Sequence, residues 1–256
     1  MTRKPAPTAA TYPLADGVVA LPAGFALLAR SQVLLVADAH FGYEDVMGGG
    51  AALPLWSTAE MAASIAIAAQ RCGAREIVFL GDVLHGSAMS AGAAGVVTGA
   101  LRELRSVAAL TFVAGNHEGR SRGTAILGPT VESCQRDGWL LAHGDKPGTR
   151  GARSIIGHFH PSLHLGGGAS VPAFLAGETI VVVPALTPYS RGFDVLSDEC
   201  IAALAPWNVR RSDLHVVAAT SEHVLPFGTL SALCSTLRRP ALRSGPGYKR
   251  RRLEPN

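Results

Sequence analysis

Five short motifs rich in histidine and in carboxylate or amide side chains follow one another along the sequence, most of them directly after an apolar run. They are Asp38-Ala39-His40, Gly81-Asp82-Val83-Leu84-His85, Gly115-Asn116-His117-Glu118, Ala142-His143-Gly144-Asp145 and Gly157-His158-Phe159-His160. Together they contain six of the nine histidines of the chain. Oxygen ligands and imidazoles in this mixture suit Mn²⁺, Fe or Zn²⁺ better than Ca²⁺ or Mg²⁺ alone. The sequence therefore predicts a centre for two divalent metal ions, of the kind that hydrolases use.

The predicted metal ligands come from all five motifs. A centre with two metal ions about 3.5–4 Å apart needs a carboxylate that both ions share. We assign this role to Asp82, because the glycine before it lets the backbone turn tightly and brings the carboxylate inward. Asp38, His40 and His160 complete the first site, and Asn116, His143 and His158 complete the second. His158 and His160 lie two residues apart, so a turn must send their side chains to different metal ions.

His117 has a different predicted role, because its neighbour Asn116 occupies a metal position and leaves the imidazole facing the substrate phosphate. It is the predicted catalytic residue, either as the general acid for the leaving oxygen or as a stabiliser of transition-state charge. Arg120 and Arg122 are predicted to contact the phosphate, and His85, Glu118 and Asp145 to support the ligands from behind. For each of these five, an ordinary surface or turn position is the alternative.

The elements that must position the motifs alternate between strands and helices in the first half of the chain. Buried strands are predicted at 33–37, 77–80 and 110–113, and helices at 58–71 and 91–104. The first helix has a capping box, Ser57-x-x-Glu60, at its start and Gly73 at its end. This order predicts right-handed crossovers in an α/β sheet, with the ligands on loops at the carboxyl ends of the strands.

The pattern changes in the second half, where helical periodicity is weak. Short strands are predicted at 139–142, 154–156, 171–175, 179–183 and 201–204, separated by glycine and proline turns. These strands predict a second, mainly antiparallel sheet. Glycine triplets at 48–50 and 166–168 predict mobile loops near the mouth of the site, although glycine there could serve only to form a turn.

Charge is distributed unevenly along the chain. Residues 1–206 carry 14 Lys and Arg against 16 Asp and Glu, whereas residues 207–256 carry 9 against 3. We therefore expect a catalytic domain over 1–206 and a basic, partly disordered C-terminal extension over 207–256, which would attract nucleic acid. A solvated end without a partner is the alternative. Within the extension, 214–218 and 230–237 could form a docked strand and helix.

Composition excludes several classes of protein. Apolar residues make up 48% of the chain and charged residues 16%, which is typical of a chain with a sizeable core rather than of a disordered one. No uncharged apolar stretch approaches the roughly 20 residues of a membrane span, and no apolar signal region follows the first residues. The four cysteines are scattered, which predicts reduced thiols, a cytoplasmic location and neither a zinc ribbon nor a redox motif.

The five motifs resemble those of the calcineurin-like metallophosphoesterase superfamily, over about residues 18–206. The resemblance implies an α/β fold, a four-layer αββα sandwich of two mixed sheets with a metal site at the strand ends. It also implies the two ligand sets given above, with Asp82 bridging the metal ions and His117 as the catalytic histidine.

Details of the motifs are similar to those of the ligase-associated PdeM-type and SbcD-related small phosphoesterases. The similar parts are the second motif, the last motif with Pro161 after it, and the segment 183–186. This resemblance implies phosphodiesterase activity that favours Mn²⁺, and a part in DNA repair. The sequence departs from the group at Glu118, where Asp is commoner, and over 186–192, where the group tends to have a Phe-Gly-rich turn.

The leading hypothesis is a phosphodiesterase that hydrolyses P–O bonds by attack of a hydroxide bridging two metal ions, on a phosphoester substrate that includes nucleic acid. The short segment between Asp82 and Asn116 leaves no room for a large cap, which favours extended substrates. A phosphomonoesterase or nucleotide pyrophosphatase that acts on a small molecule is the alternative, since the same metal core serves these reactions. A metal-binding scaffold without turnover is a third hypothesis.

Overall fold

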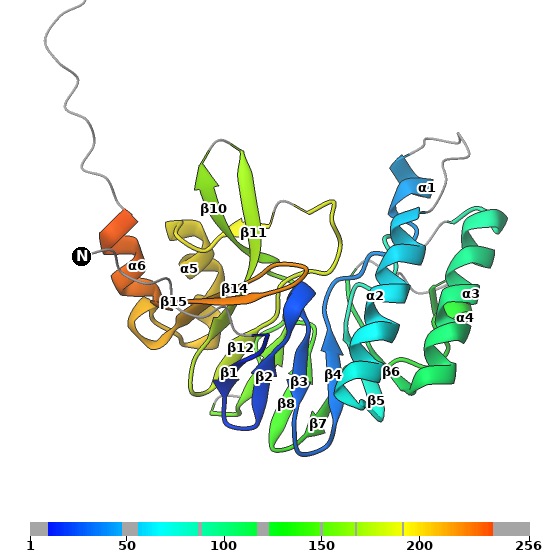
Figure 1. The fold of residues 1–256 in the computed structure, drawn as a ribbon, viewed down its shortest axis with the longest axis horizontal. Helices are drawn as coiled ribbons and strands as arrows, with labels where there is room; N and C mark the ends of the chain where they lie inside the picture. Colours follow the sequence, from blue (N-terminus) through cyan, green and yellow to red (C-terminus); the bar gives the residue numbers. More distant parts are fainter. Residues whose placement is uncertain are drawn as a thin grey trace, which may run out of the picture.

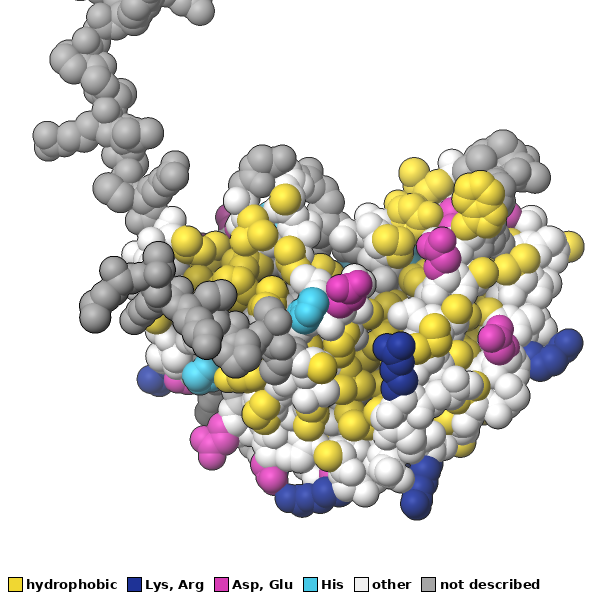
Figure 2. Space-filling model, in the orientation of Figure 1, with side chains coloured by type: hydrophobic (Ala, Val, Ile, Leu, Met, Phe, Trp, Pro, Cys, Tyr) yellow, Lys and Arg dark blue, Asp and Glu magenta, His cyan; other side chains and the backbone are white. Residues whose placement is uncertain are grey.

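The structure of the protein is a computed structural model that describes residues 10–47, 56–86, 89–116, 123–148, 151–166, 168–190 and 192–237. Two sheets lie face to face, and helices cover the outer face of each (Figure 1). At one end of the molecule, a hollow separates the hairpin of β10 and β11 from helix α1 (Figure 2). Within the described residues, no helix combines the length and the apolar composition that crossing a membrane requires.

The first sheet has six strands in sequence order: β1 (Tyr12–Ala15), β2 (Val18–Ala20), β3 (Ala26–Leu28), β4 (Val33–Val36), β5 (Glu76–Leu80) and β6 (Ala109–Val113). The strands β4, β5 and β6 are parallel and agree with the predicted strands within about one residue. The antiparallel strands β1, β2 and β3 extend this sheet and were not predicted.

The helices of the first half are α1 (Tyr43–Met47), α2 (Trp56–Cys72), α3 (Ala91–Val107) and α4 (Gly123–Leu127). Helix α2 ends before Gly73, as predicted, and this glycine has a φ of 65° that favours its residue type. The predicted capping box is wrong. Ser57 lies inside α2, where its backbone N–H and its hydroxyl both donate to the carboxylate of Glu44 in α1.

The second sheet has nine strands: β7 (Ser133–Arg136), β8 (Trp139–Ala142), β9 (Ser154–Ile156), β10 (Pro161–Gly166), β11 (Ala169–Ala176), β12 (Ile180–Val182), β13 (Phe193–Asp194), β14 (His215–Ala219) and β15 (Val224–Thr229). The strands β8, β9 and β12 are parallel to one another, and β13 is parallel to β10. The other pairings are antiparallel, so the sheet is mixed. Helices α5 (Asp198–Leu204) and α6 (Leu230–Leu237) follow the strands of this half.

The predicted strand at 201–204 is wrong, because this segment is the second half of helix α5. Ser197 caps the helix, since its side chain accepts a hydrogen bond from the backbone N–H of Cys200. Two acidic residues in the first turn stabilise the same end through the helix dipole. Cys200 and Leu204, four residues apart, are both buried and form the inner face of the helix.

Three apolar cores divide the molecule into four layers. In β4, Leu34 and Val36 belong to a core with residues of α2 and α3. Val33 and Leu35, on the opposite face of the strand, belong to the core between the two sheets together with Trp139 of β8. A third core joins the outer face of the second sheet to α5 and α6. Helix, sheet, sheet and helix layers follow one another, which confirms the predicted αββα sandwich.

The described part of the C-terminal region joins the second sheet. Strand β14 pairs with β11, and β15 pairs with β14. Residues after 207 therefore belong to the same sheet as the strands from β7 onward. The segments 214–218 and 230–237 correspond to β14 and α6, as the sequence suggested. The basic residues from 238 to 256 lie outside the described residues, as do 48–50 and 167 of the two glycine triplets. All four cysteines are free thiols.

Candidate metal centre

The motif residues lie just after strands that end at one edge of the sandwich. Asp38, Asp82 and Asn116 follow β4, β5 and β6 of the first sheet, and His143 and His158 follow β8 and β9 of the second. Within each sheet these strands are parallel, so their carboxyl ends lie side by side. The two sheets therefore bring together side chains that are up to 122 positions apart, from Asp38 to His160.

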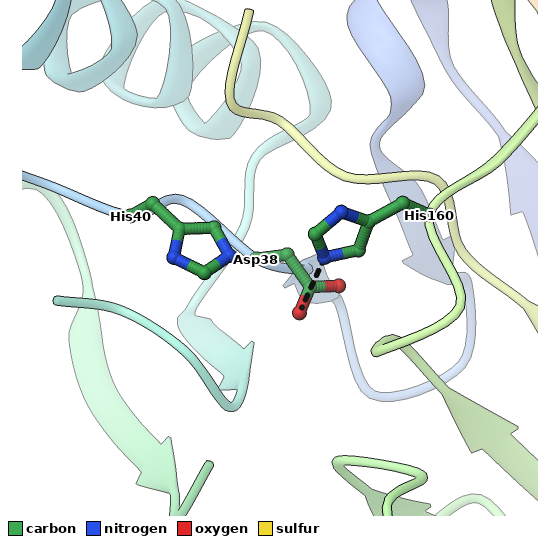
Figure 3. Close-up of side chains that lie close together, drawn as sticks. All are labelled: Asp38, His40 and His160. Atoms are coloured by element: carbon green, nitrogen blue, oxygen red, sulfur yellow. Dashed lines mark ion pairs between the residues drawn. The ribbon is translucent and has the colours of Figure 1, made fainter. Parts of the chain in front are cut away.

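The first group of side chains consists of Asp38, His40 and His160. Their ligand atoms lie within 4.8 Å of one another, and the three side chains point toward a common space (Figure 3). Nε2 of His160 is 3.3 Å from Oδ1 of Asp38. Asp38 is fully buried, and His40 is 5% exposed. These are the three residues that the sequence assigned to the first metal site.

The second group consists of Asp82, His143 and His158, whose ligand atoms also lie within 4.8 Å of one another. Three atoms converge on Nε2 of His143: Nδ1 of His158 at 3.0 Å, Oδ1 of Asn116 at 2.9 Å and Oδ2 of Asp82 at 3.4 Å. One ring nitrogen carries at most one proton and cannot satisfy all three partners. A cation among these atoms would satisfy them, so the donor set fits a metal ion.

The two groups form one centre, because Asp38 contacts both. Its Oδ1 is 3.8 Å from Nδ1 of His143, and its Oδ2 accepts a hydrogen bond of 2.8 Å from the backbone N–H of His158. Oδ1 of Asp38 is buried and has no hydrogen-bond donor among the described residues. A buried carboxylate oxygen without a donor is costly, and a cation between Asp38 and its neighbours would remove that cost. The first group thus fits a metal ion as well.

The centre uses backbone conformations that are rare for residues with side chains. Five of its residues have a positive φ: Asp38 (49°), His40 (47°), Asp82 (45°), His158 (66°) and His160 (43°). Left-handed positions of this kind cost on the order of 1–2 kcal/mol each and concentrate at functional sites. They also supply the turn that the His-x-His motif requires, since they direct the two imidazoles into different groups.

The glycines that begin three of the motifs leave room for side chains of other motifs. A Cβ atom would lie 2.3 Å from Nδ1 of His143 if placed on Gly81, 2.2 Å from Oδ1 of Asp82 if placed on Gly115, and 2.6 Å from Oδ2 of Asp38 if placed on Gly157. No other residue type fits at these three positions without displacing a predicted ligand.

The electrostatics of the centre favour positive charge. Burial disfavours the protonated form of His143, but the hydrogen bond to Asp82 and the charges of Asp38 and Asp82 outweigh it and raise the pKa of His143 to about 9. Burial and the neighbouring charge of His143 lower the pKa of His158. The carboxylates thus create a negative electrostatic potential that attracts a divalent cation. Imidazoles that ligate such a cation must be neutral.

Groups behind the imidazoles fix their orientation. Nδ1 of His143 donates to the carbonyl of Leu80 at 2.9 Å, which leaves Nε2 directed at the centre. Nδ1 of His160 is 2.7 Å from Oγ of Ser190, and Nδ1 of His85 is 3.3 Å from Nδ1 of His40. His85 therefore lies against a ligand, whereas Asp145 is exposed.

Sequence reasoning did not find Leu80 or Ser190 as partners of the histidines. A backbone carbonyl leaves no trace in the residue type, which is why the contact of Leu80 could not be found. Ser190 lies in the segment 186–192 that departs from the family pattern, and this departure was the only signal. His117, Glu118, Arg120 and Arg122 lie outside the described residues.

Comparison with known proteins supports the fold. No protein-family model matches the sequence, and a search of curated proteins finds no match. Among solved structures, the Pseudomonas putida nuclease MPE aligns with a TM-score of 0.61 and 22% identity, over 82% of this chain and 94% of that one. YfcE, a phosphoesterase from E. coli, aligns with a TM-score of 0.37 and 17% identity, over 63% of this chain and 81% of that one, which is too distant to support an argument. The chain shares the fold of the nuclease, in agreement with the metallophosphoesterase fold that its motifs predict.

Proposed function

We propose that this protein is a metal-dependent phosphodiesterase with two metal ions, which hydrolyses P–O bonds. The observation that carries the proposal is the contact between two groups of buried carboxylate and imidazole ligands through Asp38. Within the described residues, Oδ1 of Asp38 has no hydrogen-bond donor, and three atoms converge on the single Nε2 of His143, so both groups fit a divalent cation. Two adjacent cations can supply the activated water and the charge stabilisation that phosphoester hydrolysis needs.

Each side chain of the centre has a role in this proposal. Asp38, His40 and His160 hold one cation, Asn116, His143 and His158 hold the other, and Asp82 is shared. Nδ1 of His143 keeps its proton on the carbonyl of Leu80, so that Nε2 is available as a ligand. Mn²⁺ is the metal that we propose, because the ligand set mixes imidazoles with hard oxygen ligands. Fe and Zn²⁺ suit the same ligands.

His117 is the catalytic residue in this proposal. It follows Asn116 directly, so its backbone is next to a ligand of the second site while its imidazole is not needed for metal binding. A protonated imidazole at this place would donate to the leaving oxygen of the phosphodiester, and a neutral one would stabilise charge less well. Arg120 and Arg122 would contribute positive charge to the same phosphate.

Nucleic acid is the substrate class that we propose, with a part in DNA repair in the cytoplasm. The support is the shared fold with a nuclease and the concentration of basic residues in 238–256. Deletion of 238–256 should weaken binding to single-stranded DNA and reduce the salt dependence of the affinity, because fewer phosphates are neutralised. An unchanged affinity and salt dependence would remove the tail from the proposal.

Turnover by metal-stripped protein titrated with Mn²⁺ tests the proposed reaction. We expect faster hydrolysis of bis-p-nitrophenyl phosphate than of p-nitrophenyl phosphate. Asp82→Asn should lose both metal and turnover, whereas Glu103→Gln, which removes a charge from the exposed face of α3, should keep both. His117→Ala should keep the metal and lose most of the turnover. A preference for the monoester would identify a phosphomonoesterase, and bound metal without turnover on either ester would contradict the proposal.

A further inference from the structure

A row of four rings in contact leads from the metal centre to the protein surface, and the outer two of them, Tyr43 and Tyr189, are stacked. The rings of His40 and His85 have centroids 5.3 Å apart, and those of His85 and Tyr43 are 4.3 Å apart. Tyr43 then stacks on Tyr189 at 4.3 Å with an angle of 9° between the ring planes. The row begins at a predicted metal ligand and ends at a side chain that is 43% exposed.

The outermost ring is partly exposed. Tyr43 covers one face of Tyr189 in a nearly parallel stack, and no other ring among the described residues stacks on Tyr189, which is 43% exposed. An aromatic face open to solvent beside a polar centre is a surface on which a planar ring can stack. Because Tyr43 packs against Tyr189 from behind, it fixes the plane of the Tyr189 ring and therefore the plane in which a stacked ring would lie.

The segment that carries Tyr189 is attached to the metal centre at both of its ends. The backbone N–H of Leu186 donates to the carbonyl of Ala37 at 2.9 Å, and that of Thr187 donates to the carbonyl of Asp38 at 3.2 Å. On the other side of Tyr189, Oγ of Ser190 is 2.7 Å from Nδ1 of His160. Tyr189 is therefore placed between two contacts to predicted metal ligands, which fixes its position relative to the reacting phosphate.

Glu44 adds a third constraint on this part of the structure. This residue is 8% exposed and follows Tyr43 in α1. Burial alone would raise the pKa of Glu44, but hydrogen bonds from Ser57 and Tyr189 lower it. The carboxylate of Glu44 accepts both hydrogen bonds of Ser57 and so connects α1 to the start of α2, behind the stacked pair of Tyr43 and Tyr189. A ligand that stacks on Tyr189 would meet a surface that is already ordered, which reduces the entropic cost of binding.

We propose that Tyr189 is a stacking platform for an unpaired nucleobase of the substrate. The proposal rests on the proposed phosphodiesterase function and narrows its substrate to phosphodiesters that carry exposed bases, such as single-stranded nucleic acid. Stacking on an aromatic side chain does not depend on base identity, since every base has a π face. The two rings of Tyr43 and His85 separate Tyr189 from the predicted ligand His40, so the stacked base belongs to a nucleotide next to the scissile one. Base pairs in the interior of a duplex are stacked on both of their faces and cannot stack on this ring.

A binding experiment tests the platform without turnover. The full-length, metal-stripped protein is titrated into a single-stranded oligonucleotide that contains 2-aminopurine, whose fluorescence falls when the base stacks. We expect quenching with the wild-type protein and with Tyr189→Phe. Tyr189→Ala should lose the quenching and bind about 5- to 100-fold more weakly. Phe227→Ala, which removes another exposed aromatic ring on β15, is the matched control and should resemble wild type.

A turnover experiment separates a role in base recognition from a structural role. Two single-stranded oligonucleotides of the same length are compared with Mn²⁺, one with all its bases and one with abasic positions. For the wild-type protein, kcat/KM should be higher on the oligonucleotide with bases. Tyr189→Ala should remove that preference through KM and leave the abasic substrate unaffected.

The outcomes distinguish the two proposals. Equal losses on both oligonucleotides, or unchanged quenching by Tyr189→Ala, would overturn the stacking platform while leaving the phosphodiesterase intact. Absence of turnover on every diester, together with quenching that depends on Tyr189, would overturn the phosphodiesterase and leave the platform as a nucleobase-binding site.

Discussion

The two ends of the sheet sandwich differ in how they treat buried polar groups. Where β4 and β5 end, Asp38 is fully buried, and in the part of the chain that the structure describes one of its carboxylate oxygens has no hydrogen-bond donor. Where β5 begins, both carboxylate oxygens of Glu76 accept hydrogen bonds from Arg136 on β7, at 2.8 and 2.9 Å. The first end leaves polar atoms available for a ligand, and the second uses them to join the two sheets.

Other contacts at the second end follow the same rule. The backbone N–H and the hydroxyl of Ser31 both donate to Oδ2 of Asp137 at 3.1 Å, which connects the loop after β3 to the loop after β7. Nε1 of Trp139 donates to the carbonyl of Asp16 at 3.2 Å. Each of these contacts links the first sheet to the second. One end of the sandwich thus uses its polar groups to hold the two sheets together, whereas the other combines strained backbone positions with a buried carboxylate oxygen that lacks a donor among the described residues.

The largest expected effect comes from Asp38→Asn, which breaks the centre at the residue that joins its two halves. Turnover at fixed Mn²⁺ should fall by more than about 100-fold, since losing a ligand costs more than losing a partner behind one. The unfolding free energy of the metal-stripped protein should fall by about 1–3 kcal/mol, because the charge that is removed raises the pKa of His143 and accepts a hydrogen bond from the backbone of His158. Metal content, turnover and urea unfolding measure the three quantities. A large loss of stability without loss of turnover would show that Asp38 serves the stability of the fold and not the metal centre.

Gly157→Ala should have the next largest effect, because its methyl group would lie 2.6 Å from Oδ2 of Asp38 and 2.9 Å from Cβ of Ala37. Metal affinity should fall by about 10- to 100-fold, and the unfolding free energy by about 1–3 kcal/mol. Gly99→Ala on α3 is the matched control, since nothing lies within 4 Å of its added methyl group. That variant should gain about 0.5–1 kcal/mol through helix propensity. Identical behaviour of the two variants would contradict the packing argument.

A smaller effect, on stability rather than on turnover, is expected from Glu76→Gln, at the end of the sandwich opposite to the metal centre. The hydrogen bonds from Arg136 lower the pKa of Glu76, against the opposing effect of burial. A carboxyl with a lowered pKa in the folded state stabilises the fold above its unfolded pKa of 4.5, and this contribution is lost as the pH falls through the folded value. Glu76→Gln should therefore reduce the unfolding free energy by about 1–2 kcal/mol at pH 7 and flatten its decline below pH 4.5.

Turnover of Glu76→Gln at pH 7 should equal that of wild type, because Glu76 lies at the end of β5 that is opposite to Asp82. Urea unfolding between pH 3 and 7 and the turnover assay check both statements. A loss of turnover without a loss of stability would show that the two ends are coupled.

The smallest effect is expected from Arg30→Ala, which removes an exposed ion pair with Asp16 at the second end. The side chains of this pair are 65% and 60% exposed, so solvent screens their attraction. The unfolding free energy should change by less than about 0.5 kcal/mol, and the change should vanish at high salt. A larger effect in urea unfolding would mean that exposed pairs also hold the sheets together.

The motif residues that the sequence grouped together lie close to one another in the structure, whereas several elements around them were not predicted. An apolar run followed by a ligand motif marks β4, β5 and β8, because strand periodicity and site chemistry occur side by side there. The strands β1 to β3 have three or four residues each and, unlike the equally short β4 and β8, no ligand motif follows them to mark where they end.

Long-range contacts explain the errors. The Ser57-x-x-Glu60 pattern matches a capping box, but Glu44 from another helix receives both hydrogen bonds of Ser57. At 201–204 the short apolar run imitates a strand, whereas the cap at Ser197 is the signal that determines the helix. The left-handed backbone of the ligands leaves no mark in the sequence, since aspartate and histidine occur in many conformations.

The three motif glycines have a consequence for transplanting this centre into another protein. Each glycine holds open a volume that a side chain from a different loop fills, so the loops interlock in pairs. A single loop grafted elsewhere would carry its ligand without the recess that receives it. The loop left behind would face an empty space. A functional graft must therefore transfer each glycine together with the ligand that faces it. The smallest segment that can be transferred is thus a pair of loops and not a single motif.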